Sequence, residues 1–386
     1  MPSDTSDRVK VAVAGVEYSK WFEVEMDSDI FMPADAFSVR ARAPGAQLVG
    51  AFREGMSCDV YVGDDRQMAG VIDDVVVEGT RSAETLALTG RDKGAFLVDG
   101  EAETIRAAKY SAKTLAEKLL KPSWGIKNVV FSNALNRKLL LGKKDRKSKA
   151  GTSRNAPVFA DGFSPRAVTK VDPGQRVAQI LDQHLRQLGL MWWLSAQGDL
   201  FIGKPDYEQE PSFYFYSFPP GDKRAVDNNV ESYTVTRSIG ERFSEIRVVG
   251  NTAATGTGAN IFTGDSSKTG GSFKAAATDP DLVNRNIERR MILTDGDVAN
   301  ASQAKNRAEY EMGRRRLSAL TIKITVPGFR GGRDGSRLYT IDTLATVRIP
   351  TAGIDGQFYV AQRKFIETRP KRRTELTLHE KGVFLP

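Results

Sequence analysis

The chain has few side chains that could act as nucleophiles or soft metal ligands. Its 386 residues include one cysteine, Cys58, and two histidines, His184 and His379. A catalytic thiol needs a basic neighbour that keeps it ionised, yet Cys58 lies in a strand-like run, Met56–Val62, that holds no basic residue. We interpret Cys58 as a small packed side chain. With one cysteine, no disulfide can form within the chain.

The two histidines are expected to be structural. His184 lies at helical spacing from Val177 and Leu188, beside an apolar stripe, which is typical of a packed, hydrogen-bonded imidazole. His379 belongs to the last strand-like run and has no second ligand near it in the sequence. Since no cluster of Cys and His has metal-ligand spacing, we predict no metal site.

Motifs that bind phosphate or activate a serine are missing from the sequence as well. Gly256-Thr-Gly258 lacks the third glycine of a dinucleotide loop, and no phosphate-binding, zinc-protease or nucleophile-elbow motif occurs. Carboxylates are plentiful, but no pair stands out as the catalytic pair of a glycosidase. We therefore predict that the chain is no enzyme and has no catalytic, cofactor-binding or metal-binding residues, no cofactor and no small-molecule substrate.

Charge is distributed unevenly along the chain. The net charge is +8, and residues 137–154 hold eight Lys and Arg against one Asp, without the aromatic side chains that stack on nucleic-acid bases. Residues 1–100 carry ten basic and eighteen acidic side chains, whereas residues 317–386 carry twelve and six. This asymmetry favours docking between proteins. We therefore expect residues 137–154 to be a mobile loop and do not expect nucleic acid as a partner.

The pattern of residues 9–99 predicts a small β-barrel or sandwich, because short strand-like runs alternate with turns such as Pro44-Gly45. From Leu317 onward the sequence returns to strand-like patterns. No apolar run approaches the ~20 residues that a membrane-spanning helix needs, so membrane insertion is not expected.

Residues 101–226 predict a small α/β module. Ser111 is positioned to cap a first helix. Asp172-Pro173 marks the start of a second helix, with Gln175 completing the cap. A hairpin follows over Met191–Ile202, and because strand side chains alternate, Trp192 and Trp193 should face opposite sides, one in the core and one in an interface.

Two stretches near the start of the chain recur near its end. Phe37–Gly45 and Leu320–Gly328 both alternate in polarity and end in Pro-Gly, and Asp92–Leu97 resembles Glu380–Leu385. The offsets, 283 and 288 residues, are nearly equal, and a longer loop at Gly331–Arg337 accounts for the difference. We interpret the pattern as a duplicated small barrel.

The predicted fold is thus α+β and mainly β: two similar small β-barrels, the second one discontinuous, with an α/β module and an inserted helix. The predicted boundaries are 1–100 for the first barrel, 101–226 for the α/β module with its basic loop 137–170, 228–256 and 317–386 for the second barrel, and 257–316 for an inserted loop and a helix from about Ala299 to Arg316. A ring of three such chains would present six similar barrels. Such a ring could meet a six-fold structure on one face and a three-fold structure on the other.

Three longer runs, in order along the chain, carry a family resemblance. Asp172–Ile202 looks like a family's middle domain, Ala304–Gly328 like its helix leading into a second barrel, and Arg337–Val360 like that barrel's continuation. The family that they resemble is that of the baseplate hub proteins of Mu-like contractile phages, the tail protein D or late-control family. The basic stretch 137–170 is longer than the family's connection, so its role is not part of the resemblance.

The resemblance implies a structural baseplate hub, a homotrimer that lies between the tail tube and the central spike and contacts other baseplate proteins. It implies a location in the virion tail baseplate, after assembly in the cytoplasm of the bacterial host. An infectious phage and a phage-derived bacteriocin fit equally well. Two other functions remain as alternatives, a tail-associated cell-wall hydrolase and a basic nucleic-acid-binding protein. Peptidoglycan release would identify the first and salt-dependent DNA affinity the second.

Overall fold

The structure is a computed structural model that describes residues 7–43, 45–132, 167–250, 273–296, 298 and 300–384. It is mainly β, with 46% of residues in strands and 20% in helices, which confirms the predicted class. The basic stretch 137–154 and Gly256–Gly258 lie outside the described residues, so the expectations for them stay predictions. No helix in the described ranges is long and apolar enough to cross a membrane.

Residues 9–92 form an antiparallel array in the order β3-β4-β7-β6-β5-β1-β2. Alternating apolar side chains explain these strands, since every second residue of β4 and of β7 is buried. The elements are β1 (Val9–Val13), β2 (Val16–Tyr18), β3 (Glu23–Asp29), β4 (Ala36–Arg42), α1 (Gly45–Ala51), β5 (Ser57–Val62), β6 (Asp65–Gly79), β7 (Glu84–Asp92) and α2 (Gly94–Asp99).

The last part of the chain forms a second array in the order β14-β18-β23-β22-β21-β13. Its five strands from β14 to β21 follow the same order as the five from β3 to β5, all antiparallel. The sixth strand differs, because β1 is antiparallel to β5 whereas β13 is parallel to β21. The elements are β13 (Phe213–Tyr216), η3 (Lys223–Asp227), β14 (Ser232–Arg237), β18 (Leu320–Pro327), β19 (Arg330–Gly331), β20 (Arg337–Leu338), β21 (Thr343–Ile349), η5 (Pro350–Ala352), β22 (Ile354–Thr368) and β23 (Lys371–Glu380).

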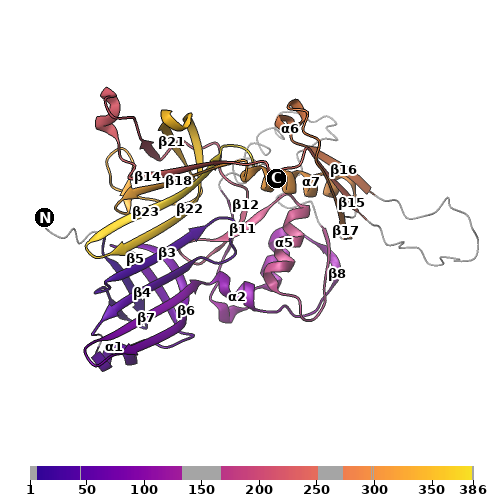
Figure 1. Cartoon of the computed structure of the whole chain (residues 1–386). Coiled ribbons are helices and arrows are strands. Elements are labelled where there is room, and N and C mark those ends of the chain that lie inside the picture. Colours follow the sequence, from indigo (N-terminus) through magenta and orange to yellow (C-terminus); the bar gives the residue numbers. More distant parts are fainter. Residues whose placement is uncertain are drawn as a thin grey trace, which may run out of the picture.

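The two arrays are not separate barrels, which corrects the sequence prediction. β22 pairs with β3, so both arrays belong to one 13-stranded sheet, drawn in indigo and yellow in Figure 1. Neither array closes on itself in the part of the chain that the structure describes. The physical reason is the length of β22, whose 15 residues extend beyond β21 and reach the neighbouring array.

Strand pairing also corrects the alignment of the repeated segments. Val39 lies opposite Leu88, and Ile324 lies opposite Leu376. Leu88 and Leu376 are 288 residues apart, the offset seen at the second repeated segment, but Val39 then matches Ile324 rather than Ile322. The shift of two residues keeps each side chain on its expected face, because strands repeat every two residues.

A separate three-stranded sheet, in the order β16-β15-β17, lies beside helix α7. The assignment of residues 245–250 to the second barrel was therefore wrong, because Val248 packs on Ala304 and Ala308 of α7 instead. The predicted helix is confirmed as α7, and its small side chains Ala304 and Ala308 face this sheet. The elements are β15 (Glu245–Gly250), β16 (Phe273–Thr278), α6 (Pro280–Asn284), β17 (Arg290–Asp295) and α7 (Ala301–Leu317).

The middle unit contains the two predicted helices and the hairpin. Ser111 caps the first helix, since its Oγ accepts the N–H of Thr114 at 3.2 Å. The second helix begins at Val177 rather than Pro173, because Gly174 takes a left-handed conformation at φ +85°. The elements are β8 (Ile105–Tyr110), α3 (Ala112–Leu119), η2 (Pro122–Trp124), β9 (Val129–Phe131), β10 (Ala167–Val171), α5 (Val177–Gln187), β11 (Met191–Leu194) and β12 (Leu200–Gly203).

The paired tryptophans of β11 face opposite sides, as predicted. Trp192 packs in the core of the middle unit, and its Nε1 donates to Asp182 at 2.8 Å. Trp193 packs with Tyr359 and Phe384, residues from the C-terminal part of the chain. The hairpin therefore attaches the middle unit to the large sheet.

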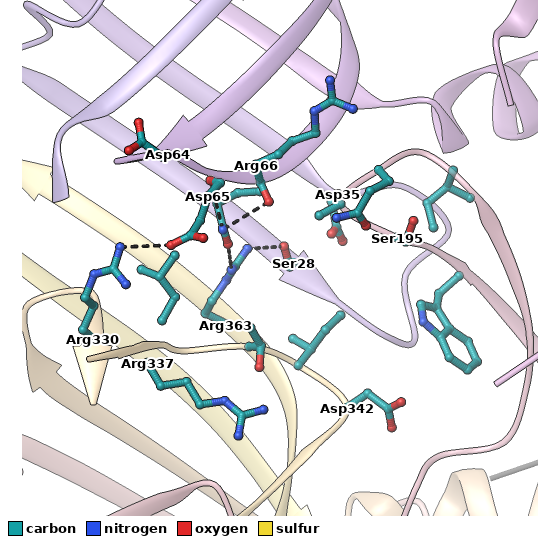
Figure 2. Close-up of a pocket in the computed structure, with 18 of the residues that line it drawn as sticks. Ser28, Asp35, Asp64, Asp65, Arg66, Ser195, Arg330, Arg337, Asp342 and Arg363 are labelled. Carbon is teal, nitrogen blue, oxygen red and sulfur yellow. Dashed lines mark hydrogen bonds and ion pairs between the residues drawn. The ribbon is translucent and has the colours of Figure 1, made fainter. Parts of the chain in front are cut away.

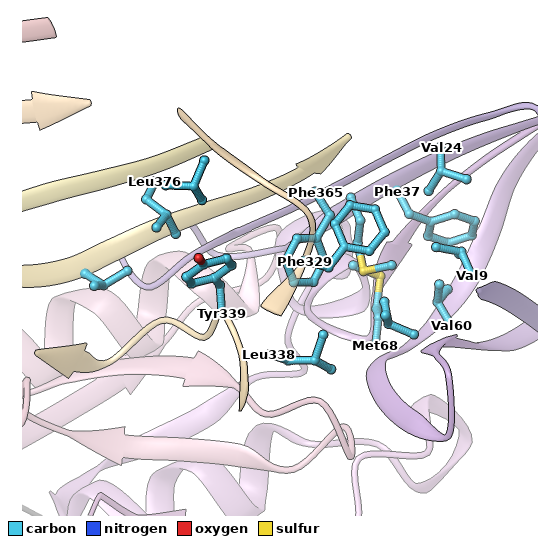
Figure 3. Packing of buried hydrophobic residues seen from close by; sticks show 14 of the residues in the cluster. Val9, Val24, Phe37, Val60, Met68, Phe329, Leu338, Tyr339, Phe365 and Leu376 are labelled. Atoms are coloured by element: carbon cyan, nitrogen blue, oxygen red, sulfur yellow. The ribbon is translucent and has the colours of Figure 1, made fainter. Parts of the chain in front are cut away.

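The main core runs across both arrays of the large sheet. Met26, Val39 and Leu88 of the first array belong to the same buried cluster as Phe365 and Leu376 of the second. Figure 3 shows Val24 and Phe37 from the first array approaching Phe329 and Phe365 from the second. The two arrays therefore share apolar burial and should unfold together.

Replacing Phe365 with Ala tests this shared core. The side chain is fully buried and packs against Phe329 in a tilted arrangement, with ring centroids 4.7 Å apart, so its loss should cost about 3–5 kcal/mol of unfolding free energy. Hydrogen exchange should then accelerate in peptides from β3 and β4 as well as from β18. Ile292→Ala, at a side chain that is 67% exposed, is the control without effect. Faster exchange confined to β18–β23 would mean that the two arrays have independent cores.

Candidate functional site: the strand junction and its polar cavity

The junction between the two arrays is created by one strand, β22. It pairs with β21 through Ile354–Val360 and with β3 through Gln362–Thr368. Against β23, the register shifts between Val360 and Gln362, so Ala361 forms a bulge at the point where the partner changes. A bulge bends a strand and increases its twist, which directs the second part of β22 toward β3.

The outer face of the junction joins the acidic strand β3 to Lys364 and Gln362 of β22. Lys364 forms an ion pair with Glu25. Nε2 of Gln362 lies 3.3 Å and 3.4 Å from the two carboxylate oxygens of Asp27. Exposed pairs of this kind contribute about 0–1 kcal/mol each, so they favour one partner and one register more than they stabilise the sheet.

The inner face of the junction carries a buried cation, Arg363. Its Nη1 donates to Oε1 of Gln67 at 2.6 Å and its Nη2 donates to Oγ of Ser28 at 2.7 Å. The guanidinium also lies 4.2 Å from the ring centroid of Phe365. Burial lowers the pKa of Arg363 to about 10, so the side chain stays charged at neutral pH and depends on these contacts.

Two carboxyls accompany this cation: Asp92 is buried, and Asp35 is half-buried at the cavity wall. Burial raises the pKa of Asp35 to about 6, although the N–H of Asp29, the hydroxyl of Ser28 and the charge of Arg363 act in the opposite direction. Burial, and then the charge of Asp35, raise the pKa of Asp92 well above its ordinary value. The two carboxyls therefore disfavour simultaneous ionisation, because each charge opposes the other.

A polar cavity of about 710 Å³ lies beside the junction (Figure 2). Four Arg and four Asp line it, so its walls have no net charge that would attract an ion. Several of these charges already have partners, since Arg66 donates to Asp59 at 2.7 Å and Arg330 to Asp65 at 3.1 Å. The described lining includes no His, Cys or Lys, and the hydroxyl of Ser28 accepts a hydrogen bond from Nη2 of Arg363.

The side chains that the sequence suggested for chemistry lie elsewhere. Cys58 is buried in the main core, where burial raises the pKa of its thiol to about 12. His184 is buried on α5, where burial lowers its pKa to about 4. His379 lies on β23, where its Nδ1 is 2.9 Å from the carbonyl oxygen of Leu317 and burial lowers its pKa. No group of three or more metal-ligating side chains occurs in the described ranges.

Sequence reasoning missed the polar residues of the junction. Arg363 was visible as a charged residue at an inward position of β22, between buried Ala361 and Phe365. Such a residue needs a buried partner, but Gln67 and Ser28 are about 300 residues away in the sequence. The sequence could therefore signal a buried polar group at Arg363 without identifying its partners.

The pH dependence of stability tests the protonation of Asp35. Its folded pKa is about 6, above the ordinary ~3.9 of an unfolded chain, so the unfolded state loses its proton first as pH rises. The wild-type protein should lose about 1–2 kcal/mol of unfolding free energy from this group between about pH 4 and 6.

Asp35→Asn should remove this loss, so the variant should gain stability relative to wild type over that window and keep the difference above it. Asp64→Asn is the control, because Asp64 is a fully exposed carboxylate in the same cavity. A variant that follows wild type at every pH in urea unfolding would show that Asp35 ionises normally.

Two family models match the two arrays of the sheet. Residues 8–92 match the N-terminal domain of the Mu phage baseplate assembly protein GpP-like family, and residues 314–383 match a tail protein C-terminal domain. No curated protein matches the chain. The models thus cover β1–β7 and β18–β23, on either side of the junction.

Solved structures resemble the whole chain. The tail protein from Neisseria meningitidis MC58 is 26% identical over 98% of both chains, with a TM-score of 0.74. The 43 kDa tail protein of prophage MuSo2 from Shewanella oneidensis is 20% identical over 98% of this chain and 99% of that one, with a TM-score of 0.71. An E. coli type VI secretion component described as similar to T4 tail proteins gp27 and gp5 shares the fold at 9% identity, 98% and 80% coverage and a TM-score of 0.53.

The resemblance that the sequence suggested is therefore supported independently at both ends of the chain and along its whole length. The chain is a structural protein of the phage-tail baseplate type, with a Mu GpP-like N-terminal domain and a tail-protein C-terminal domain.

Proposed function

We propose that this chain is the hub of a contractile tail baseplate, a ring of three copies that joins a six-fold tail tube to a three-fold central spike. The observation that carries the proposal is the shared order of five strands in the two arrays. Three copies arranged in a closed ring would present six similar arrays. Each array would face one subunit of a six-fold tube, while features present once per chain would repeat three times.

The proposal includes a duplication and a division of labour along the chain. Residues 1–100 and the later array, 228–243 with 317–386, would be copies of one unit. The middle unit, 101–226, and the inserted sheet and helix would face other baseplate proteins and the spike. We place the assembled protein in the virion tail and its assembly in the host cytoplasm, and we assign it no catalytic step.

Charge supports a head-to-tail order of the arrays. Within one chain, the contact between arrays joins Glu25 of the acidic strand β3 to Lys364 of β22. The whole segments have the same bias, acidic in 1–100 and basic in 317–386. Alternation of the two kinds of array around the ring places opposite charges at each contact, whereas contacts between like arrays would be repulsive.

The mass in solution tests the ring. Purified protein should give a species of about three times the chain mass of 42.4 kDa in light scattering at micromolar concentration or after assembly with its tail partners. The same preparation should release no peptidoglycan fragments above a heat-denatured control. A protein that remains monomeric both alone and in assembled tails contradicts the hub, and peptidoglycan release would favour the hydrolase alternative.

Ionic strength tests the role of charge. Salt screens exposed charges over about 8–10 Å, so raising salt should slow the formation of rings from monomers far more than it dissociates finished rings. Stopped-flow scattering measures the first rate and dilution the second. Association rates that do not change between low and high salt would contradict a role of charge in ordering the ring.

A further inference from the structure

Among the open strand edges of the large sheet in the described part of the chain are those of β6 and β14. β5 pairs with β6 no further than Val71, so Asp74–Gly79 of β6 pairs with β7 alone. At the other end of the sheet, β14 pairs with β18 alone. Open edges present unpaired N–H and C=O groups and favour pairing with another chain.

These edges also carry exposed apolar side chains. Val76 and Val77 on β6 are 45% and 48% exposed, and Tyr233 on β14 is 37% exposed. Tyr233 bonds to Thr351 of η5 through its hydroxyl, a contact that uses its side chain and not the backbone edge of β14. Exposed valines on an open strand edge indicate a surface that a further strand covers.

The pairing of β22 with β3 within one chain shows which strand would fit each open edge. Val75 lies opposite Leu88, and Arg363 lies opposite Leu376. Both β6 and β22 have their bulge two residues earlier, at Asp73 and Ala361, where the register against the next strand shifts. The free part of β6 is therefore the counterpart of the part of β22 that pairs with β3.

The strand β14 is the counterpart of β3 by the same reasoning. Val24 lies opposite Val39 on β4, and Tyr233 lies opposite Ile324 on β18. Val39 and Ile324 are equivalent because they face Leu88 and Leu376. In β14, Val235 thus occupies the place that Met26 has in β3.

We infer that Val75–Gly79 of β6 in one copy pairs antiparallel with Tyr233–Arg237 of β14 in the next copy, with Val77 opposite Val235. The register is that of the contact inside the chain, where Phe365 lies opposite Met26. In the same register, Val76 would lie opposite Thr236, because the equivalent residues Lys364 and Asp27 lie opposite each other within the chain. This inference rests on the proposed ring, for which it names the contact between copies.

Burial and charge agree with this contact. Phe365 and Met26 are fully buried where a strand covers them, whereas Val77 is 48% exposed and Val235 is half-buried. The pairing would bury both valines and continue the apolar core from one copy into the next. It would also join the acidic array, residues 1–100, to the array that holds the basic segment 317–386.

The arrangement is directional, which decides the kind of assembly. β6 and β14 are different strands, so each copy uses one edge toward one neighbour and the other edge toward the other neighbour. Such head-to-tail contacts form a ring when the rotation closes and a filament when it does not. Closure at three copies would make the contact between copies equivalent to the contact inside the chain.

Cysteine cross-linking tests the register. In a Cys58→Ala background, the pairs Val77→Cys with Val235→Cys, and Val76→Cys with Thr236→Cys, are compared, because neighbouring pairs alternate between the wide and the close spacing. Oxidation should give covalent three-chain rings with at least one of these two double-cysteine variants. Lys364→Cys with Asp27→Cys is the matched control, which should cross-link within one chain. The shifted pair Val77→Cys with Thr236→Cys should not cross-link, since the two side chains point to opposite faces.

Mixing experiments show that the bond joins two copies. Chains with only Val77→Cys should form a covalent dimer with chains carrying only Val235→Cys, and neither should do so alone. If the protein is trimeric by mass but neither matched pair cross-links, or the shifted pair reacts equally well, the register is wrong and the hub proposal stands. A covalent ladder longer than three chains contradicts closure, and a protein that is monomeric under all conditions contradicts the hub itself.

A charged substitution provides a second measurement that does not depend on oxidation. Val77→Lys should leave the circular dichroism spectrum unchanged, because the side chain is exposed in the single chain, and should weaken trimer formation about tenfold or more. Ile292→Lys is the matched control, because Ile292 is an exposed apolar strand residue outside the large sheet. Equal trimer formation by the two variants would contradict an interface at β6.

Discussion

The pairing of β22 with β3 is the contact on which the rest of the large sheet depends. A strand has two edges, and β22 uses one of them for β23 along most of its length while dividing the other between β21 and β3. The bulge at Ala361 lies at this division. The second part of β22 leaves its own array, and that array does not close. The first array, which β22 joins at β3, does not close either. One extended strand thus converts two small arrays into a single sheet with two open ends.

The polar groups at this junction follow from the same geometry. Where two arrays meet, the inner face carries Arg363 and Ser28 directly opposite each other, in place of an apolar pair. A buried guanidinium is a costly residue unless its donors are satisfied, and a shift of one residue would remove Ser28 and expose Phe365. Arg363 therefore contributes to the choice of register more than to the free energy of unfolding. The pKa values of the neighbouring carboxyls, Asp35 and Asp92, are raised mainly by burial beside the same junction.

The sequence predicted the fold class and many elements because those depend on local pattern. The helix capped by Ser111, the hairpin with Trp192 and Trp193, and helix α7 all follow from spacing within about twenty residues. The predictions that failed required contacts distant in sequence. Residues 245–250 alternate like a barrel strand, yet pair in another sheet, and nothing in the pattern of β22 shows that its second part leaves its array. The partners of Arg363 were hidden for the same reason.

The differences between the two arrays bear on how a duplicated protein can adapt one symmetry to another. In the first array, β3 connects to β4 by the short segment 30–35, whereas the corresponding connection from β14 to β18 holds the inserted sheet and α7. The strand beside β5 is the antiparallel β1, whereas the strand beside β21 is the parallel β13, which follows the middle unit. The central five strands are thus alike and their connections differ. In the proposed ring, a partner that contacts only the central strands would meet six similar surfaces, and a partner that contacts the insertions would meet three. The change of symmetry would then require no change of conformation, because both symmetries exist in different layers of the same chain.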